Sequence, residues 1–101
     1  MSDVIQSSNS TKINIKKPSL YKILFFNDDY TPFLFVEKIL TVIFNKTTEE
    51  AYLIAQTIHS EGSAVIAVFP KEIAVTKQAQ TLYNAEKNNF PLRCEIEPED
   101  E

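Results

Sequence analysis

The residues best suited to chemistry in this chain are grouped in one short segment. Asn27, Asp28 and Asp29 place an amide and two carboxylates side by side, directly after the strand-forming run 21–26. Such a group offers several hydrogen-bond acceptors and negative charge, as a cation or an amine requires. The same residue types are also typical of a strand-to-helix turn with a capping aspartate. The residue types alone leave both interpretations open.

The one histidine, His59, follows Ile58 near the end of an expected helix. A lone histidine there is usually a half-buried packing residue. It could join Asp28 and Asp29 in a metal triad, but nothing fixes that geometry. A nucleophilic pair of Cys94 and His59 has no further support either, because a cysteine in a strand is more often a packing residue. We expect no catalytic residue, no metal and no cofactor.

Composition narrows the classes of function. The 101 residues include one Gly and one Cys, which excludes glycine-rich phosphate loops, an internal disulfide and cysteine-rich zinc modules. Five of the 14 acidic residues lie in the last seven positions, so the rest of the chain is almost neutral. We therefore expect no nucleic-acid partner, since no basic stripe is evident. Without a long apolar run or a secretory layout, we also expect no membrane segment and a cytoplasmic location.

Hydrophobic periodicity and end signals predict the secondary structure. Thr31 and Pro32 are typical of a helix cap and first helical position, and Thr47 and Glu50 have the spacing of a capping box. Gly62 is a natural helix terminator. The expected elements are strand 21–26, helix 32–44, helix 48–61, buried strand 63–69, helix 71–88 with Val75, Ala79 and Leu82 on one face, and edge strand 92–97.

This order, βααβαβ, predicts an α+β two-layer sandwich with three helices packed on one face of a three-stranded antiparallel sheet. Residues 1–17 are rich in Ser, Thr and Asn, which predicts a flexible arm. The core domain is expected at 18–98 and an acidic tail at 99–101.

The stretch from about Leu20 to Glu97 resembles the ClpS family, the adaptor of the bacterial ATP-dependent Clp protease. The most specific match is the string Asn27-Asp28-Asp29-Tyr30-Thr31-Pro32. The other matching motifs, in order and at compatible spacing, are Pro18-Ser19-Leu20-Tyr21-Lys22, Phe35-Val36, Ile58-His59, Gly62, Ala64-Val65, Val68-Phe69, Glu72, Thr76-Lys77 and Pro91-Leu92.

The resemblance implies a non-catalytic adaptor that binds N-degrons, which are proteins whose first residue is Leu, Phe, Tyr or Trp. The resemblance also implies that the adaptor delivers them to the hexameric unfoldase ClpA, and we expect it to be a monomer when free. It implies that Asn27, Asp28 and His59 surround the substrate's α-amino group and that Asp29 supports the start of the bound backbone. The implied side-chain pocket is lined by Thr31, Phe33, Val36, Ala55, Ile58 and Leu92, and the implied unfoldase contacts are Glu72 and Lys77. The arm would take part in delivery.

Two positions depart from the family pattern. Phe33 and Ala55 stand where the family commonly has Met, which adds bulk on one side of the implied pocket and removes it on the other. Substrates should remain bulky and apolar, but their order of preference is open.

Two other classes of function remain as alternatives. One is an interaction or scaffold module, since a ribosomal stalk domain has a similar element order, although fold analogy does not establish function. The other is a small hydrolase with His59 and Asp28 as an acid–base pair, which lacks an accompanying nucleophile or metal set.

Overall fold

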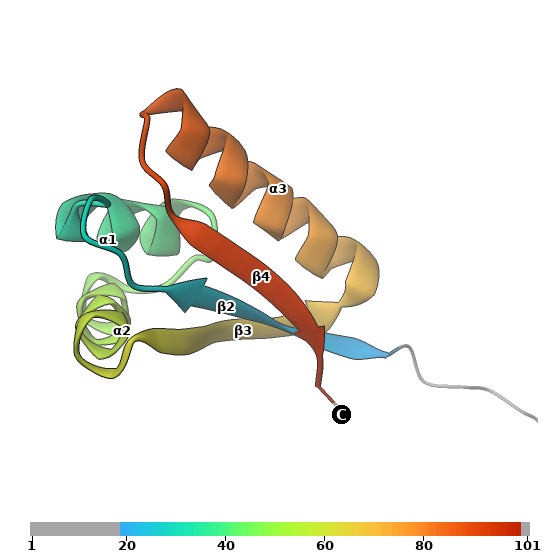
Figure 1. Ribbon diagram of the computed structural model, residues 1–101. Coiled ribbons are helices and arrows are strands. Elements are labelled where there is room, and N and C mark those ends of the chain that lie inside the picture. The colour runs from blue at the N-terminus through green and yellow to red at the C-terminus, as the bar shows by residue number, and fades with distance from the viewer. Residues whose placement is uncertain (1–18, 100–101) are drawn as a thin grey trace, which may run out of the picture.

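The structure is a computed structural model that describes residues 19–99 (Figure 1). Its elements follow the predicted order: β2 (Leu20–Phe26), α1 (Phe33–Val42), α2 (Thr48–Glu61), β3 (Ser63–Pro70), α3 (Lys71–Lys87) and β4 (Arg93–Pro98). The predicted α+β class is confirmed, with the helices on one face of an antiparallel sheet. The predicted arm, 1–17, and residues 100–101 of the predicted tail lie outside the described residues.

The sheet has β2 in the centre, with β3 and β4 as its antiparallel neighbours. The prediction of β4 as an edge strand is confirmed. The prediction that 63–69 is a buried strand is wrong, because β3 is the other edge and no described element covers one face of the sheet. Val65 and Val68 lie on that uncovered face and are 48% and 37% exposed. A continuous apolar run is typical of a strand covered on both faces, and here only one face is covered.

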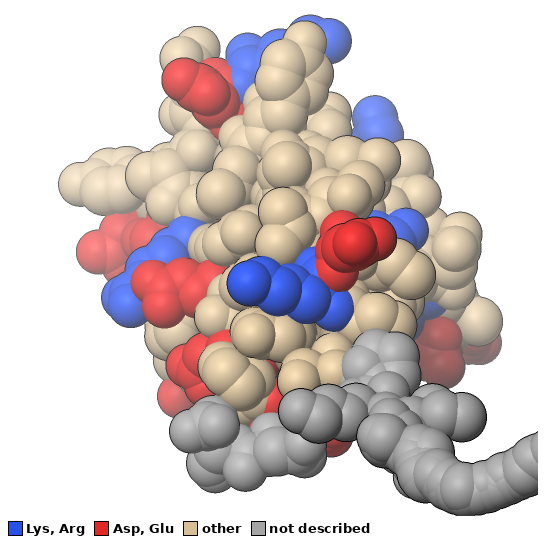
Figure 2. All heavy atoms as spheres, turned by 90° about the vertical axis from the view of Figure 1, so that its right-hand side faces the viewer, with Lys and Arg blue, Asp and Glu red and all other residues tan. Residues whose placement is uncertain are grey.

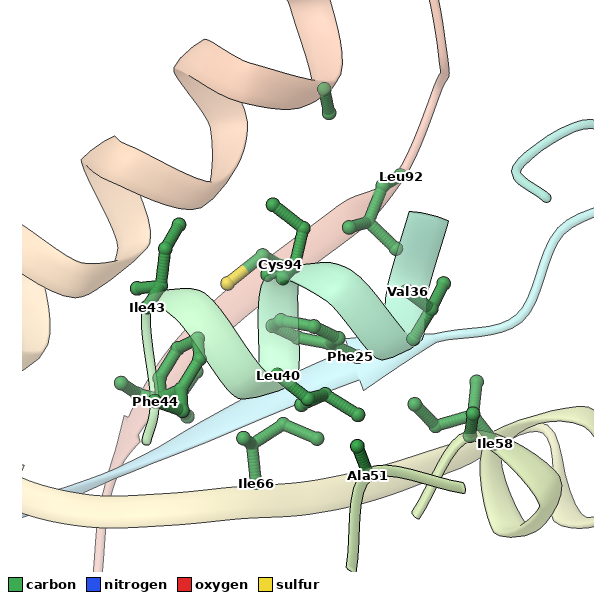
Figure 3. Close-up of a cluster of buried hydrophobic side chains, with 14 of the residues drawn as sticks. Phe25, Val36, Leu40, Ile43, Phe44, Ala51, Ile58, Ile66, Leu92 and Cys94 are labelled. Atoms are coloured by element: carbon green, nitrogen blue, oxygen red, sulfur yellow. The ribbon is translucent and has the colours of Figure 1, made fainter. Parts of the chain in front are cut away.

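The core lies between the covered face of the sheet and the helices (Figure 3). Ile23 and Phe25 alternate toward it from β2, and Cys94 faces it from the position opposite Phe25 in β4. Leu40 of α1 is fully buried in the same cluster. The rings of Phe25 and Phe44 meet edge to face, with centroids 5.7 Å apart. Burial of each large side chain stabilises the fold by about 1.5–3 kcal/mol.

Both ends of α2 form as predicted. The Thr47 hydroxyl accepts from the backbone N–H of Glu50, and the Glu50 carboxylate accepts from that of Thr47. Gly62 ends the helix with φ +96°, a conformation that costs a residue with a Cβ about 1–2 kcal/mol. The capping box fixes where α2 begins, and Gly62 fixes where it ends. His59 lies in the last turn before Gly62.

The start of α1 differs from the prediction by one residue. Pro32 is the N-cap rather than the first helical residue, and Thr31 lies outside the helix. The Thr31 hydroxyl does not cap the helix because it donates to Asp28 instead. Thr31, which was expected to cap the helix, therefore belongs to the preceding loop.

Helix α3 packs on the sheet through small side chains. Ala74, Thr81 and Ala85 are its buried residues. The predicted face of Val75, Ala79 and Leu82 is exposed, because the small residues on the other side allow the helix backbone to lie close to the sheet. The amide of Gln78 donates to the carbonyl of Cys94 at 2.9 Å, which joins the helix to β4.

Charges of both signs are interspersed on the face shown in Figure 2, and no broad area of one sign is visible there. One pair of opposite charges, Lys22 and Glu97, lies across β2 and β4 with the ammonium 3.9 Å from a carboxylate oxygen. In the described part of the chain, no helix has both the length and the hydropathy needed to cross a bilayer.

Candidate functional site

The loop after β2 is organised by one carboxylate. Oδ1 of Asp28 accepts from the backbone N–H groups of Tyr30 and Thr31 at 2.8 and 2.7 Å, and Oδ2 accepts from the Thr31 hydroxyl at 2.7 Å. Partial burial raises the pKa of Asp28, but these three hydrogen bonds together lower it more, so the net pKa lies below its ordinary value. Asp28 is therefore a fixed negative charge at neutral pH.

A backbone contact joins this loop to the end of α2. The N–H of Asn27 donates to the carbonyl of Gly62 at 2.9 Å. Because Gly62 is the C-cap of α2, this bond brings the loop next to the helical turn that carries Ile58 and His59. Residues 27–31 and 55–59, far apart in the sequence, thereby form two sides of one cavity.

The cavity has a volume of about 450 Å³, within the usual range for a small-ligand site. Its apolar part includes three core residues, Val36, Ala55 and Ile58, each at most 7% exposed. Polar side chains gather around the same space. The complete lining is Asn27, Asp28, Asp29, Thr31, Phe33, Val36, Ala55, Ile58 and His59.

This set contains nine of the ten residues assigned to substrate binding from the sequence. The tenth, Leu92, does not line the cavity. Its side chain is 5% exposed and belongs to the hydrophobic core (Figure 3). It lines instead a wider hollow of about 640 Å³, together with Tyr30 and the end of α3. The polar side chains that line that hollow are Tyr30, Glu86 and Asn89, so it contains one carboxylate and no histidine.

The two residues assigned to unfoldase binding are in different environments. Glu72 lies exposed in the first turn of α3. Lys77 is half-buried, and its ammonium donates to the carbonyl of Ile43, the C-cap of α1, at 2.7 Å. The same ammonium lies 5.9 Å from the centroid of the Phe69 ring. Lys77 therefore joins α3 to the end of α1, a structural role that the sequence did not indicate.

Sequence reasoning also missed Tyr52. Its ring packs edge to face on Phe33, with centroids 5.7 Å apart and an interplanar angle of 71°. Tyr52 does not line the cavity but contacts a residue that does. The available signal was its spacing, since Tyr52 precedes Ala55 by three residues on α2 and therefore shares a helix face with it.

Three features of the described residues bear on the hydrolase alternative. Within residues 19–99, the hydrogen bonds of the Asp28 carboxylate come from Tyr30 and Thr31, and none joins it to His59. Burial, with a smaller contribution from Glu95, raises the pKa of the Cys94 thiol to about 12, so it is not a nucleophile at neutral pH. The described residues also contain no cluster of three or more His, Cys, Asp or Glu side chains that could hold a metal ion.

A comparison with family models decides the family. The model "ATP-dependent Clp protease adaptor protein ClpS" matches residues 16–95. The chain belongs to the ClpS family. The ClpS adaptor of Hyphomonas neptunium is 44% identical over 93 residues, covering 92% of this chain and 79% of the relative. That of Treponema denticola is 40% identical over 94 residues, covering 91% and 93%.

A solved ClpS structure shares the fold. The structure of Agrobacterium tumefaciens ClpS2 bound to L-phenylalaninamide superposes with a TM-score of 0.80 at 37% identity, and the match covers 82% of this chain and all of that one. The bound compound has a free α-amine and a bulky apolar side chain.

Proposed function

We propose that this chain is a non-catalytic adaptor that binds proteins with a bulky hydrophobic first residue and delivers them to the Clp protease. The candidate first residues are Leu, Phe, Tyr and Trp. The observation that supports this proposal is the single cavity in which Asn27, Asp28 and His59 lie beside a pocket of core side chains. The L-phenylalaninamide bound by the Agrobacterium tumefaciens relative supports it further.

The α-ammonium of the substrate is the group that the polar residues would bind. An ammonium has three N–H donors and a positive charge, so it requires several acceptors and favours a nearby carboxylate. Asn27 supplies a carbonyl oxygen, His59 a ring nitrogen and Asp28 a fixed negative charge. Asp29, exposed at the rim, would accept from the first backbone N–H groups of the bound chain.

The apolar side chain of the first residue would occupy the space bounded by Val36, Ala55 and Ile58. Burying a Leu or Phe side chain contributes about 1.5–3 kcal/mol, and a charged hydrogen bond contributes about 1.5–3 kcal/mol. Ordering of the ligand and loss of its free motion offset part of this sum. Each half of the site is therefore needed for binding, and the complex is reversible.

Delivery requires a second surface. We assign docking of a ClpA-type unfoldase hexamer to the exposed side of α3 around Glu72, with Lys77 holding that helix in place. Residues 1–17 would take part in the transfer. The free adaptor would be a cytoplasmic monomer with no nucleic-acid or membrane partner.

The deciding experiment is a titration of the purified chain with fluorescent peptides that begin with Leu, Phe, Trp or Ala. Each peptide is made with a free and with an acetylated amine. Peptides with a free amine and a bulky first residue should bind, whereas acetylation should abolish binding because it removes the charge and places a carbonyl among acceptors. Equal binding of free and acetylated peptides would overturn the proposal.

The residues are tested in the same assay. Asn27→Ala and His59→Ala should each weaken binding of the Phe-starting peptide without unfolding the domain. Ser60→Ala, an exposed neighbour that does not line the cavity, is the matched control and should bind as the parent does.

A further inference from the structure

Phe33 is the most exposed of the apolar residues that line the cavity, so the core determines its position least among them. It is the first residue of α1 and is 37% exposed, whereas its cavity neighbours Val36 and Ile58 are 7% and 3% exposed. Its ring therefore has room to adopt other rotamers unless another side chain restrains it. The orientation of that ring decides the shape of one wall of the cavity.

Where α2 faces Phe33 across the cavity, it does little to restrain the Phe33 ring. Ala55 of α2 lines the same space and contributes only a methyl group. One turn earlier on the same helix, Tyr52 packs edge to face on the Phe33 ring, with centroids 5.7 Å apart. Tyr52 is 46% exposed and does not line the cavity, so it influences the cavity through its contact with Phe33.

A restrained aromatic wall distinguishes between first residues of similar hydrophobicity. A phenyl or indole group can pack edge to face or offset on the Phe33 ring, and such pairs gain free energy beyond the apolar area that they bury. The isobutyl group of Leu has no aromatic ring, so it cannot form such a pair with Phe33. An unrestrained ring would have to be ordered on binding, which would reduce the advantage of an aromatic ligand.

From this contact we infer that Tyr52 is a positioning residue that holds Phe33 as an aromatic wall and thereby selects aromatic over aliphatic first residues. The inference rests on the proposed function. Its substrate class is polypeptides that begin with Phe, Tyr or Trp, with Leu as a weaker class.

The test compares the Phe-starting and Leu-starting peptides on the parent and on Tyr52→Ala. The ratio of their two affinities should fall by about two- to tenfold in the variant, the range expected for one aromatic pair. Tyr52→Phe keeps the ring and should restore the ratio of the parent. Tyr83→Ala removes an exposed tyrosine from α3 and is the matched control, with an unchanged ratio.

A second variant keeps the inference testable if Tyr52→Ala folds poorly. Phe33→Leu removes the ring but keeps apolar bulk, and it should lower the same ratio. Adding Tyr52→Ala to Phe33→Leu should change the ratio no further, because the two residues act through one contact. An unchanged ratio in both single variants would overturn the inference while the amine requirement, and with it the proposed function, still stands. Loss of the amine requirement in the parent would overturn both.

Discussion

The side chains of Thr31 and Asp28 are joined by a hydrogen bond of 2.7 Å, and the backbone N–H of Thr31 donates to the other carboxylate oxygen of Asp28 at the same distance. One carboxylate therefore shapes the loop and keeps a negative charge beside the cavity. A substitution of Asp28 can therefore change both the conformation of the loop and the negative charge that the cavity offers to a ligand.

Asp28→Asn should separate these two roles. The amide keeps one oxygen acceptor for the loop N–H groups but removes the charge. Affinity for a Phe-starting peptide should fall by about five- to tenfold, since a charged hydrogen bond is worth about 1 kcal/mol more than a neutral one. Calorimetric titration measures this. The acetylated peptide should be equally poor on both proteins, and an unchanged affinity of the free peptide would contradict a role for the charge.

The stability of the fold should depend on Asp28 at acid pH. Its pKa is lowered in the folded protein, so the stability that it contributes is fully present above the ordinary Asp pKa, about 4, and is lost as pH falls through the lowered folded value. Urea unfolding of the parent and of Asp28→Asn at a series of pH values measures this contribution. The difference in unfolding free energy should be constant near neutral pH and shrink in acid. A difference that grows toward acid pH would contradict the assignment.

Cys94 should be inert in the folded protein. The residue is 3% exposed, and burial raises the pKa of its thiol to about 12, so almost no thiolate is available at neutral pH. Iodoacetamide should label the urea-unfolded chain rapidly and the native chain only as it opens. Mass spectrometry of timed samples reports the extent of labelling. Rapid labelling in the absence of urea would show that the thiol is accessible.

Lys77→Met should destabilise the domain. The change removes the hydrogen bond to the Ile43 carbonyl at the end of α1, and partial exposure of the site limits the expected cost to about 1–2 kcal/mol. Thermal unfolding measures the loss. Lys38→Met, at an exposed position on α1, is the control and should change stability by less than about 0.5 kcal/mol.

The same variant clarifies any test of delivery. If Lys77 supports the docking surface through the fold, the loss of delivery in Lys77→Met should follow its loss of stability. Glu72→Gln should reduce unfoldase binding while thermal unfolding stays at the parent value. Equal stability of Lys77→Met and the parent would contradict the structural role.

Gly62→Ala should affect both the fold and the site. No atom lies within 4 Å of the added Cβ, so the cost arises from φ +96° and is about 1–2 kcal/mol. Relaxation of that strain would also move the carbonyl that accepts from Asn27. Peptide affinity should therefore fall together with the unfolding midpoint. Full affinity in a destabilised variant would show that the Asn27–Gly62 contact does not position the site.

Local patterns in the sequence determined the elements and the main site segment. The capping box at Thr47 and the left-handed Gly62 follow from residues close in the chain, and both form as predicted. Hydrophobic periodicity together with the end signals was sufficient to predict α1 and α2. The acceptor-rich segment beginning at Asn27 was identifiable because its polar groups are consecutive in the sequence.

The tertiary structure decided the features that depend on partners distant in the chain. The exposure of Val65 follows from the edge position of β3, and the half-buried Lys77 follows from the approach of α3 to the end of α1. Leu92 belongs to the core rather than to the cavity, and Tyr52 reaches the cavity only through Phe33. The sequence shows the chemical type of each side chain. The neighbours of a side chain depend on how the helices and strands pack, since packing brings together groups that lie far apart in the sequence.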